Sequence, residues 1–264
     1  MRIALGVEYD GSAFMGWQRL SHGPSVQQVV EQALSRVADH PVNVICAGRT
    51  DSGVHALGQV VHFDSCAERP LHAWTLGGNR HLPATVSLLW ARRMPDDFHA
   101  RYRALQRSYR YTLLNRSARP ALEARRVAWI RQPLDAGRMH QAAQSLVGEH
   151  DFSSFRAAGC QARTPVREIR HIAVFRRGDR ILLEVVGNAF LHHMVRNIVG
   201  ALIPVGTGDR PVEWLADLLQ LRDRRRGGVT APAHGLVFLG PDYGAEYGLP
   251  RASVGLYSAQ ECRE

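Results

Sequence analysis

Strand-type and helix-type apolar patterns alternate along this chain, and that alternation constrains its fold more than any other feature of the sequence. Short segments place apolar residues at every second position, as half-buried strands do, and longer segments place them three or four positions apart, as amphipathic helices do. No repeat of solenoid length and no low-complexity stretch interrupts this order. The sequence therefore predicts a mixed α+β protein.

The expected elements fall into two series. Ser25 and Gln28 form a capping box that opens a helix whose inner face carries valine, alanine and leucine. The second series begins after residue 104, so we predict an N-terminal α+β half at 1–104 and a C-terminal α+β half at 105–264. Further helices are expected at residues 136–146, 188–203 and 212–221, and strands at residues 3–8, 42–46, 59–63, 86–91, 108–114, 169–175, 180–186 and 236–239.

The charge of the chain favours a polyanionic partner. Its 33 basic residues are all arginine and oppose 24 acidic residues, which gives a formal net charge of +9. Such a balance is typical of proteins that bind nucleic acid. The absence of lysine excludes pyridoxal Schiff-base chemistry, Walker-type phosphate binding and kinase-type catalysis, because each of them requires a lysine ammonium.

No apolar segment approaches the roughly 20 residues that cross a bilayer, and acidic residues follow the first residues too closely for a signal peptide. We therefore expect a cytoplasmic protein that does not bind membranes. The cysteines form no CxxC pair, so we expect buried free thiols rather than disulfides or a zinc site. They are Cys46, Cys66, Cys160 and Cys262.

The segment from residue 48 to residue 55, Gly-Arg-Thr-Asp-Ser-Gly-Val-His, places one carboxylate, Asp51, between two glycines. These glycines predict a tight loop whose backbone a large ligand can approach closely. An aspartic protease also uses an Asp-Ser-Gly turn, but it needs a second aspartate to share a proton. Here the turn occurs once, and Arg49 would favour the charged carboxylate over proton sharing. The remaining alternative is that Asp51 caps a turn and Arg49 is solvated.

Basic and aromatic residues interleave in two neighbouring segments, residues 101–103 and 107–111. If the second segment is a strand, Arg107, Tyr109 and Tyr111 share one face. We expect Tyr111 to lie in the core. Tyr109 is either a core ring or a stacking platform for an unpaired base.

Arg196 lies in a strongly apolar stretch that is expected to be helical. An unpaired guanidinium there would cost several kcal/mol, so we expect a carboxylate partner, with Asp51 as the candidate. The adjacent His192 and His193 lack the spacing of a metal site, which favours packing or RNA contact. The basic run at residues 222–226 suits phosphates and plain solvent equally well.

Together, these segments resemble the tRNA pseudouridine synthase A family, whose members isomerise uridines in the anticodon arm of tRNA. The resemblance covers nearly the whole chain, and its motifs occur in the family's order, which makes it highly specific. Two positions depart from the family pattern: Ser52 stands where alanine is commoner, and His234 where glutamate is usual. The segments that carry the resemblance are Tyr9-Asp10-Gly11 with Gly16-Trp17-Gln18, Ser25-Val26-Gln27, and residues 48–55, 107–111, 190–200 and 230–236.

The resemblance implies a fold and a site. Two similar α+β halves would join into one long, mixed, mostly antiparallel sheet with the active-site cleft at its centre. Asp51 is implied as the catalytic residue and Arg196 as its salt-bridge partner. Tyr109 is implied to stack on the target uracil, Arg49 to displace the target base, and Leu236 to form an apolar wall of the uracil pocket.

The implied reaction needs no cofactor and no metal, because the bond from ribose C1′ to uracil N1 breaks and the ring rejoins through C5. Asp51 attacks C1′, attacks uracil C6 or removes a proton at C2′, and the sequence leaves these routes open. The resemblance also implies a homodimer that grips the anticodon stem-loop of one tRNA, with target uridines at tRNA positions 38, 39 and 40. The alternative is a non-catalytic basic RNA-binding module, which would not explain an apolar helix that carries Arg196.

Overall fold

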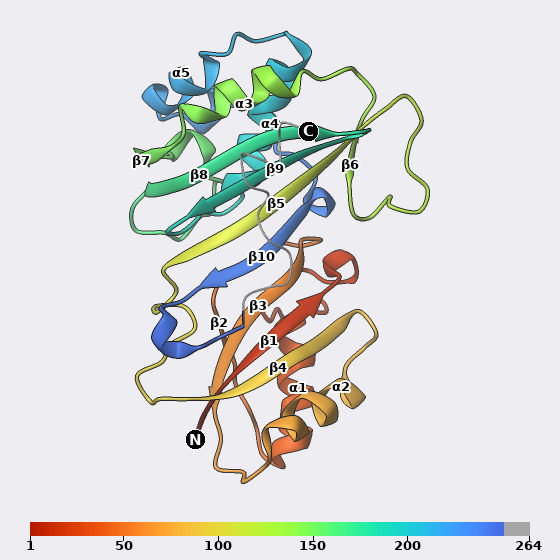
Figure 1. Ribbon diagram of the computed structural model, residues 1–264, viewed down its shortest axis with the longest axis vertical. Helices are drawn as coiled ribbons and strands as arrows, with labels where there is room; N and C mark the ends of the chain where they lie inside the picture. Colours follow the sequence, from red (N-terminus) through yellow and green to blue (C-terminus); the bar gives the residue numbers. More distant parts are fainter. Residues whose placement is uncertain (251–264) are drawn as a thin grey trace. The chain divides into compact units, whose positions relative to one another are not determined.

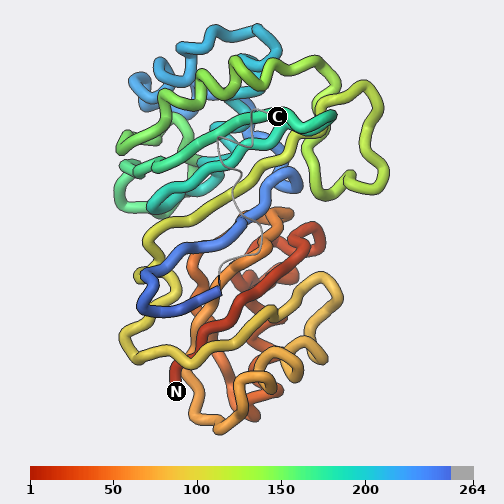
Figure 2. Tube along the Cα trace, viewed as in Figure 1, coloured from red at the N-terminus to blue at the C-terminus, as the bar shows by residue number. Residues whose placement is uncertain are grey.

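The computed structural model describes residues 1–250, and Cys262 lies outside them. The chain forms two compact units: the first contains Met1–Arg107 and resumes at Val237, and the second is Ser108–Leu236. The predicted C-terminal half, 105–264, differs from the second unit because the chain returns to the first unit after Leu236. Figure 2 shows this return, where the blue segment runs beside an orange strand of the first unit.

The sheet of the first unit is built around β1 (Figure 1). Its strands among the described residues are β1 (Arg2–Tyr9), β2 (Ile45–Cys46), β3 (His55–Asp64), β4 (Val86–Met94) and β10 (Leu236–Asp242). β1 is antiparallel to both β3 and β4, β10 is parallel to β3, and β2 is antiparallel to β3. The strand expected at residues 42–46 is thus limited to its last two residues.

Helix α1 (Val26–Ala38) begins where the capping box predicts, because the Ser25 hydroxyl accepts a hydrogen bond from the Gln28 amide at 3.3 Å. The predicted inner face is largely confirmed, although Val29 and Val37 are only half-buried. α1 packs against α2 (Gly78–His81). Neither α2 nor the π-helical turn before it was expected, since both are too short to show a clear period.

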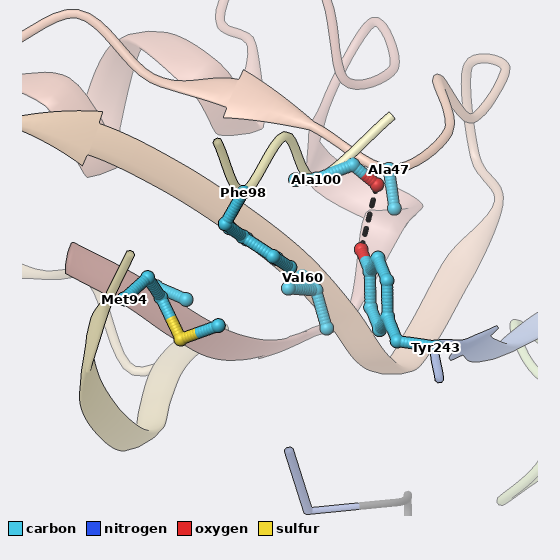
Figure 3. Close-up of a cluster of buried hydrophobic side chains, with 7 residues drawn as sticks. Ala47, Val60, Met94, Phe98, Ala100 and Tyr243 are labelled. Carbon is cyan, nitrogen blue, oxygen red and sulfur yellow. Dashed lines mark hydrogen bonds between the residues drawn. The ribbon is translucent and has the colours of Figure 1, made fainter. Parts of the chain in front are cut away.

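The last strand also contributes to the core of the first unit. Tyr243, which follows β10, packs with Phe98 and Val60 and donates a hydrogen bond from its hydroxyl to the carbonyl oxygen of Ala100 at 2.6 Å (Figure 3). Burial raises the pKa of this hydroxyl, so it stays protonated and able to donate.

The second unit has a sheet in which β5 neighbours β9, β9 pairs antiparallel with β8, and β8 with β7. Its strands are β5 (Gln106–Asn115), β6 (Ala128–Ile130), β7 (Gly148–Asp151), β8 (Val166–Arg177) and β9 (Arg180–Gly187). The short strands β6 and β7 were not expected. The helices are α3 (Ala136–Gln144), α4 (Met194–Thr207) and α5 (Trp214–Leu221), with α3 packed on β8 and on α4 (Figure 1). Helices packed on mostly antiparallel sheets confirm the predicted α+β class.

The helix expected at residues 188–203 was predicted to start too early, since α4 begins at Met194. His193 caps it in the left-handed conformation, with φ of 61°, which no α-helix can include. Upstream, the backbone NH of Asn188 donates to the carbonyl oxygen of Glu168 at 3.1 Å, and the carbonyl of His192 accepts from the Ala157 amide at 3.0 Å. The bond to His192 takes a carbonyl group that a helix through this segment would use, and the bond of Asn188 ties the segment to β8 instead.

The cysteines of the described residues are free but not uniformly buried. Cys46 is buried, which raises its pKa to about 12, whereas Cys66 is exposed and Cys160 is half-buried. The expectation of buried thiols is therefore wrong for Cys66, because it lies just after the end of β3. Within residues 1–250, no helix combines the length and apolar character that crossing a membrane requires.

Candidate active site

Asp51 lies in the loop between β2 and β3 of the first unit. The loop is a tight turn, as predicted: the Val54 amide donates to the Asp51 carbonyl oxygen at 3.1 Å, and Gly53 takes φ of 78°, a left-handed conformation that favours glycine. Asp51 is half-buried and Arg49, on the same loop, is exposed. The turn therefore fixes the backbone that carries the Asp51 carboxylate, while the Arg49 guanidinium is accessible to a large ligand.

A second segment, residues 9–17, cradles this loop. The Tyr9 hydroxyl bonds the Thr50 hydroxyl at 2.7 Å in a buried contact, and the Trp17 amide donates to the Thr50 carbonyl oxygen at 3.0 Å. A Cβ atom on Gly16 would lie 2.7 Å from that same oxygen, and Gly16 has φ of 94°. The hydrogen bond from Trp17 and the close approach of Gly16 therefore both fix Thr50, the residue that precedes Asp51.

Gly11, the other glycine of this segment, is also required by a close backbone contact. A Cβ on Gly11 would lie 2.0 Å from the Val54 carbonyl oxygen, and the Gly11 amide donates to Nδ1 of the buried His55 at 3.1 Å. Sequence reasoning used these residues only as family motifs and missed their positioning role. The glycines at positions 11 and 16 were the available signal for this role. Their contact with the loop at 48–55 is not local in sequence, so the sequence alone does not show it.

Tyr109 lies on β5 of the second unit, and its residue is 9% exposed. Its ring meets Phe190 edge to face, with centroids 5.1 Å apart and planes at 77°. Tyr111, two residues on, is fully buried, as predicted, and its hydroxyl donates to the Pro232 carbonyl oxygen at 2.7 Å. Burial raises the pKa of Tyr111. A Cβ on Gly235 would lie 2.6 Å from this ring, so the segment at 232–235 packs directly on it.

Arg196 lies in the first turn of α4 and is half-buried. Its Nε donates to the Ala231 carbonyl oxygen at 2.8 Å, and the Ala231 amide donates to the Arg196 carbonyl oxygen at 3.1 Å. Gly200 allows this close approach, because a Cβ there would overlap the Val229 carbonyl oxygen. The segment that packs on α4 in this way leads to Leu236, which is buried at the start of β10.

The basic run at residues 222–226 divides into different roles. Arg224 donates to the Asn197 side-chain oxygen and to the Thr230 hydroxyl, each at 3.0 Å, so it braces the segment that Arg196 contacts. Arg225 pairs with Asp223 at 2.8 Å. Arg224 is thus a structural residue. The sequence had suggested only phosphate binding or exposure to solvent for this run.

Sequence reasoning also missed a buried ion pair in the second unit. Arg110 on β5 pairs with Glu184 on β9 at 2.5 Å, and Glu184 is fully buried. Because side chains alternate along a strand, this pair lies on the opposite face of β5 from Tyr109 and Tyr111. The signal was a single glutamate within an otherwise apolar strand pattern.

Residues 6–103 and 142–244 match the family model described as tRNA pseudouridine synthase. The chain belongs to the tRNA pseudouridine synthase family. Its curated relatives include a tRNA pseudouridine synthase A of Pseudomonas aeruginosa, 56% identical over 255 residues, which cover 96% of this chain and 90% of the relative. The enzymes of the same name from Xylella fastidiosa strain M23 and Aeromonas hydrophila are 57% and 53% identical, and the matches cover 95% and 97% of this chain and 98% and 95% of the relatives.

Among solved structures, a Cbf5-Nop10-Gar1 complex shares 13% identity over 76% of this chain and 45% of that chain, with a TM-score of 0.35, a likeness too slight to indicate function. The predicted site residues are divided between the two units. Asp51 and Arg49 share one loop of the first unit, whereas Tyr109, Arg196 and Leu236 belong to the second. The pairing of Asp51 with Arg196 stays a prediction.

Proposed function

We propose that this chain is an isomerase that converts uridine to pseudouridine at positions 38, 39 and 40 of the tRNA anticodon arm. Family membership over nearly the whole chain carries the proposal, and it is supported by a rigid loop that presents a single carboxylate, Asp51, beside the exposed Arg49. We further propose that it acts in the cytoplasm as a homodimer that binds the anticodon stem-loop. Its basic balance of 33 arginines against 24 acidic residues suits a polyanionic substrate.

The reaction is an isomerisation whose atoms balance within the substrate. The bond between ribose C1′ and uracil N1 breaks, the uracil turns, and a bond forms between C1′ and C5. The proton on C5 is lost, and N1 gains one. A carboxylate serves this chemistry as a nucleophile at C1′ or C6, or as a base at C2′. In each route Asp51 is the reacting group.

The other residues prepare the substrate. A uridine in a stem or loop must leave its stack, at a cost of a few kcal/mol, before a side chain can reach its glycosidic bond. We assign the displacement of the base to Arg49, the stacking of the flipped uracil to Tyr109, and an apolar wall of the uracil pocket to Leu236. Arg196 is the proposed ion-pair partner of Asp51.

A non-catalytic basic RNA-binding module is the alternative. It would account for the arginine content and for the basic and aromatic residues of β5. It gives no reason for residues 9–17 to fix, by close glycine contacts, the backbone on either side of one carboxylate. Catalysis does require such positioning, because small displacements of a reacting group reduce rates strongly.

Tritium release from tRNA transcripts labelled at uridine C5 tests the proposal. We expect release with the wild-type protein, none with Asp51→Ala, and nearly equal tRNA affinity for both. Ser52→Ala is the matched control, since it changes the exposed neighbour of Asp51 to the residue commoner in the family, and it should retain activity. A wild-type protein that binds unmodified tRNA without releasing tritium would favour the binding module.

The finer assignments need their own measurements. Transcripts in which uridines 38, 39 and 40 are replaced one at a time by cytidine should each lose the tritium of that position. Sedimentation equilibrium of the full chain should give the mass of a dimer. Release that persists after all three replacements would contradict the assigned positions while leaving the isomerase activity in place.

A further inference from the structure

The loop at residues 99–103 of the first unit exposes an aromatic ring that the proposed chemistry does not use. Tyr102 is 74% exposed, which is uncommon for a large ring. The His99 ring stacks on it at 4.2 Å between centroids with planes at 28°, and the Arg101 guanidinium lies over the same ring, 5.6 Å from its centroid. The ring is therefore held flat against one neighbour and still has most of its surface accessible.

The backbone of this loop is fixed from within. Nδ1 of His99 accepts hydrogen bonds from the amides of both Arg101 and Tyr102 at 3.2 Å. The Arg103 amide donates to the His99 carbonyl oxygen at 2.9 Å. His99 thus accepts hydrogen bonds from the amides of three of the next four residues, and it also supplies the ring on which Tyr102 stacks.

The core of the first unit fixes the same loop from below. The Ala100 amide donates to Nδ1 of the buried His62 at 3.1 Å, and the Ala100 carbonyl accepts from the Tyr243 hydroxyl (Figure 3). Nη2 of Arg107 donates to the Arg101 carbonyl oxygen at 2.6 Å. Because the loop is hydrogen-bonded at this many positions, it presents the exposed Tyr102 ring in one orientation. Binding of a planar ligand would therefore cost little ordering of the loop.

The charge beside the ring is positive. Arg103 pairs with Asp97 at 2.7 Å, but no carboxylate of residues 1–250 is paired with Arg101, whose side chain is exposed. An exposed aromatic ring next to a free guanidinium matches the two parts of a nucleotide, since the base stacks on the ring and the phosphate meets the cation. The positive charge at the ring favours a polyanionic ligand over a protein partner.

We propose that Tyr102 and Arg101 form a second RNA contact of the enzyme, in which Tyr102 stacks on an unpaired nucleobase of the tRNA and Arg101 neutralises an adjacent phosphate. This contact rests on the proposed function only in that tRNA is the ligand. It positions the substrate and takes no part in bond breaking. Tyr102 and Arg101 together form this platform.

The test measures the dissociation constant for an unmodified tRNA transcript and the single-turnover rate at saturating enzyme. Tyr102→Ala should raise the dissociation constant about 5- to 50-fold, because stacking on one base is lost, and should leave the saturated rate unchanged. Tyr102→Trp should restore wild-type affinity. Arg101→Ala should weaken binding and reduce the slope of log affinity against log salt by about one.

Matched controls use exposed residues of the same unit that lie outside the platform. Leu76→Ala removes an apolar side chain that is 69% exposed, and Arg80→Ala removes an exposed guanidinium, so each should bind tRNA as the wild type does. Equal affinity of Tyr102→Ala and wild type would overturn the proposal. So would a loss of affinity that Tyr102→Trp does not restore, or a change of oligomeric state in Tyr102→Ala, which would make the ring a contact between copies of the chain.

The outcomes separate this proposal from the isomerase activity. If the wild-type protein releases no tritium but its tRNA affinity still depends on Tyr102, the platform stands and the enzymatic function fails. If tritium release is normal and Tyr102→Ala binds tRNA unchanged, the function stands and the platform fails.

Discussion

The hydroxyl groups of Tyr9 and Thr50 lie 2.7 Å apart in a buried hydrogen bond. Tyr9 is the last residue of β1, and Thr50 immediately precedes Asp51. The bond therefore ties a central strand of the first unit to the loop that carries the proposed catalytic carboxylate. A reacting group placed on a loop needs such support, because the loop backbone alone leaves its position free to vary.

Replacing Tyr9 with phenylalanine should impair turnover more than binding. The change removes one oxygen and leaves the Thr50 hydroxyl without that partner, so the free energy of unfolding should fall by about 1 kcal/mol. We expect kcat for tRNA to fall about tenfold or more, since small displacements of a reacting group are costly, while KM stays near wild type. Urea unfolding and steady-state tritium release measure the two effects.

Thr50 provides the control for this prediction. Thr50→Ser keeps the hydroxyl and should remain active, whereas Thr50→Val should resemble Tyr9→Phe. In the double variant, the two losses should not add, because both variants remove the same bond. Additive losses in kcat would show that Tyr9 and Thr50 act on the loop separately.

Most strands and the start of α1 could be predicted because their signals are local. The short apolar runs at residues 3–8 and 86–91 and the capping box at Ser25 depend only on near neighbours in sequence. The start of α4 could not be predicted, because His193 adopts a left-handed conformation and the stretch before it bonds to β8 and to the loop at Ala157. The apolar pattern is continuous there, and tertiary hydrogen bonds overrule it.

The candidate site also combines residues that local sequence predicts with contacts that it does not predict. Asp51 and Arg49 could be selected from one loop, since two glycines flank the acid within a few residues. The cradle around Thr50 joins segments that are more than thirty residues apart in the chain, and the pairing of Glu184 with Arg110 joins two strands that are further apart still. Periodicity predicts that a residue is buried or exposed, but it does not name the partner across a fold.

Replacing Tyr109 with phenylalanine should separate stacking from any role of the hydroxyl. The phenylalanine ring can keep the edge-to-face contact with Phe190 and the proposed stack on uracil, so tRNA affinity should remain near wild type. If the hydroxyl relays the proton lost from uracil C5, the single-turnover rate should fall at least tenfold. An unchanged rate would confine Tyr109 to stacking, and Tyr109→Ala, which removes the ring, should then weaken binding.

Replacing Arg196 with alanine should reduce both activity and stability. The variant loses the hydrogen bond from Nε to the Ala231 carbonyl oxygen, and a bond from a charged donor contributes about 1.5–3 kcal/mol. If Asp51 is its partner, tritium release should also be lost. Arg222→Ala is the control and should unfold as the wild type does. It removes an exposed arginine that lies 3.6 Å from the Asp151 carboxylate. A fully active and equally stable Arg196→Ala protein would contradict the pairing.

Acidification should destabilise the protein through His62. Burial, followed by the charges of His99 and Arg2, lowers the pKa of His62 from 6.5 to about 4, although Asp64 opposes the shift. Between these two values the unfolded chain binds a proton at this position and the folded chain does not, so stability falls as the pH decreases from 6.5 and levels off below 4. Protonation would also remove the acceptor that Nδ1 offers to the Ala100 amide.

His62→Gln isolates this effect from the carboxylates that also titrate in acid. Glutamine keeps a side-chain acceptor but does not titrate, so its unfolding free energy should change less than that of the wild type between pH 7 and pH 4.5, by on the order of 2 kcal/mol. Urea unfolding of both proteins at the two pH values gives this difference directly, whatever the absolute stability of the variant. Parallel pH dependences would show that His62 titrates alike in the folded and unfolded chains.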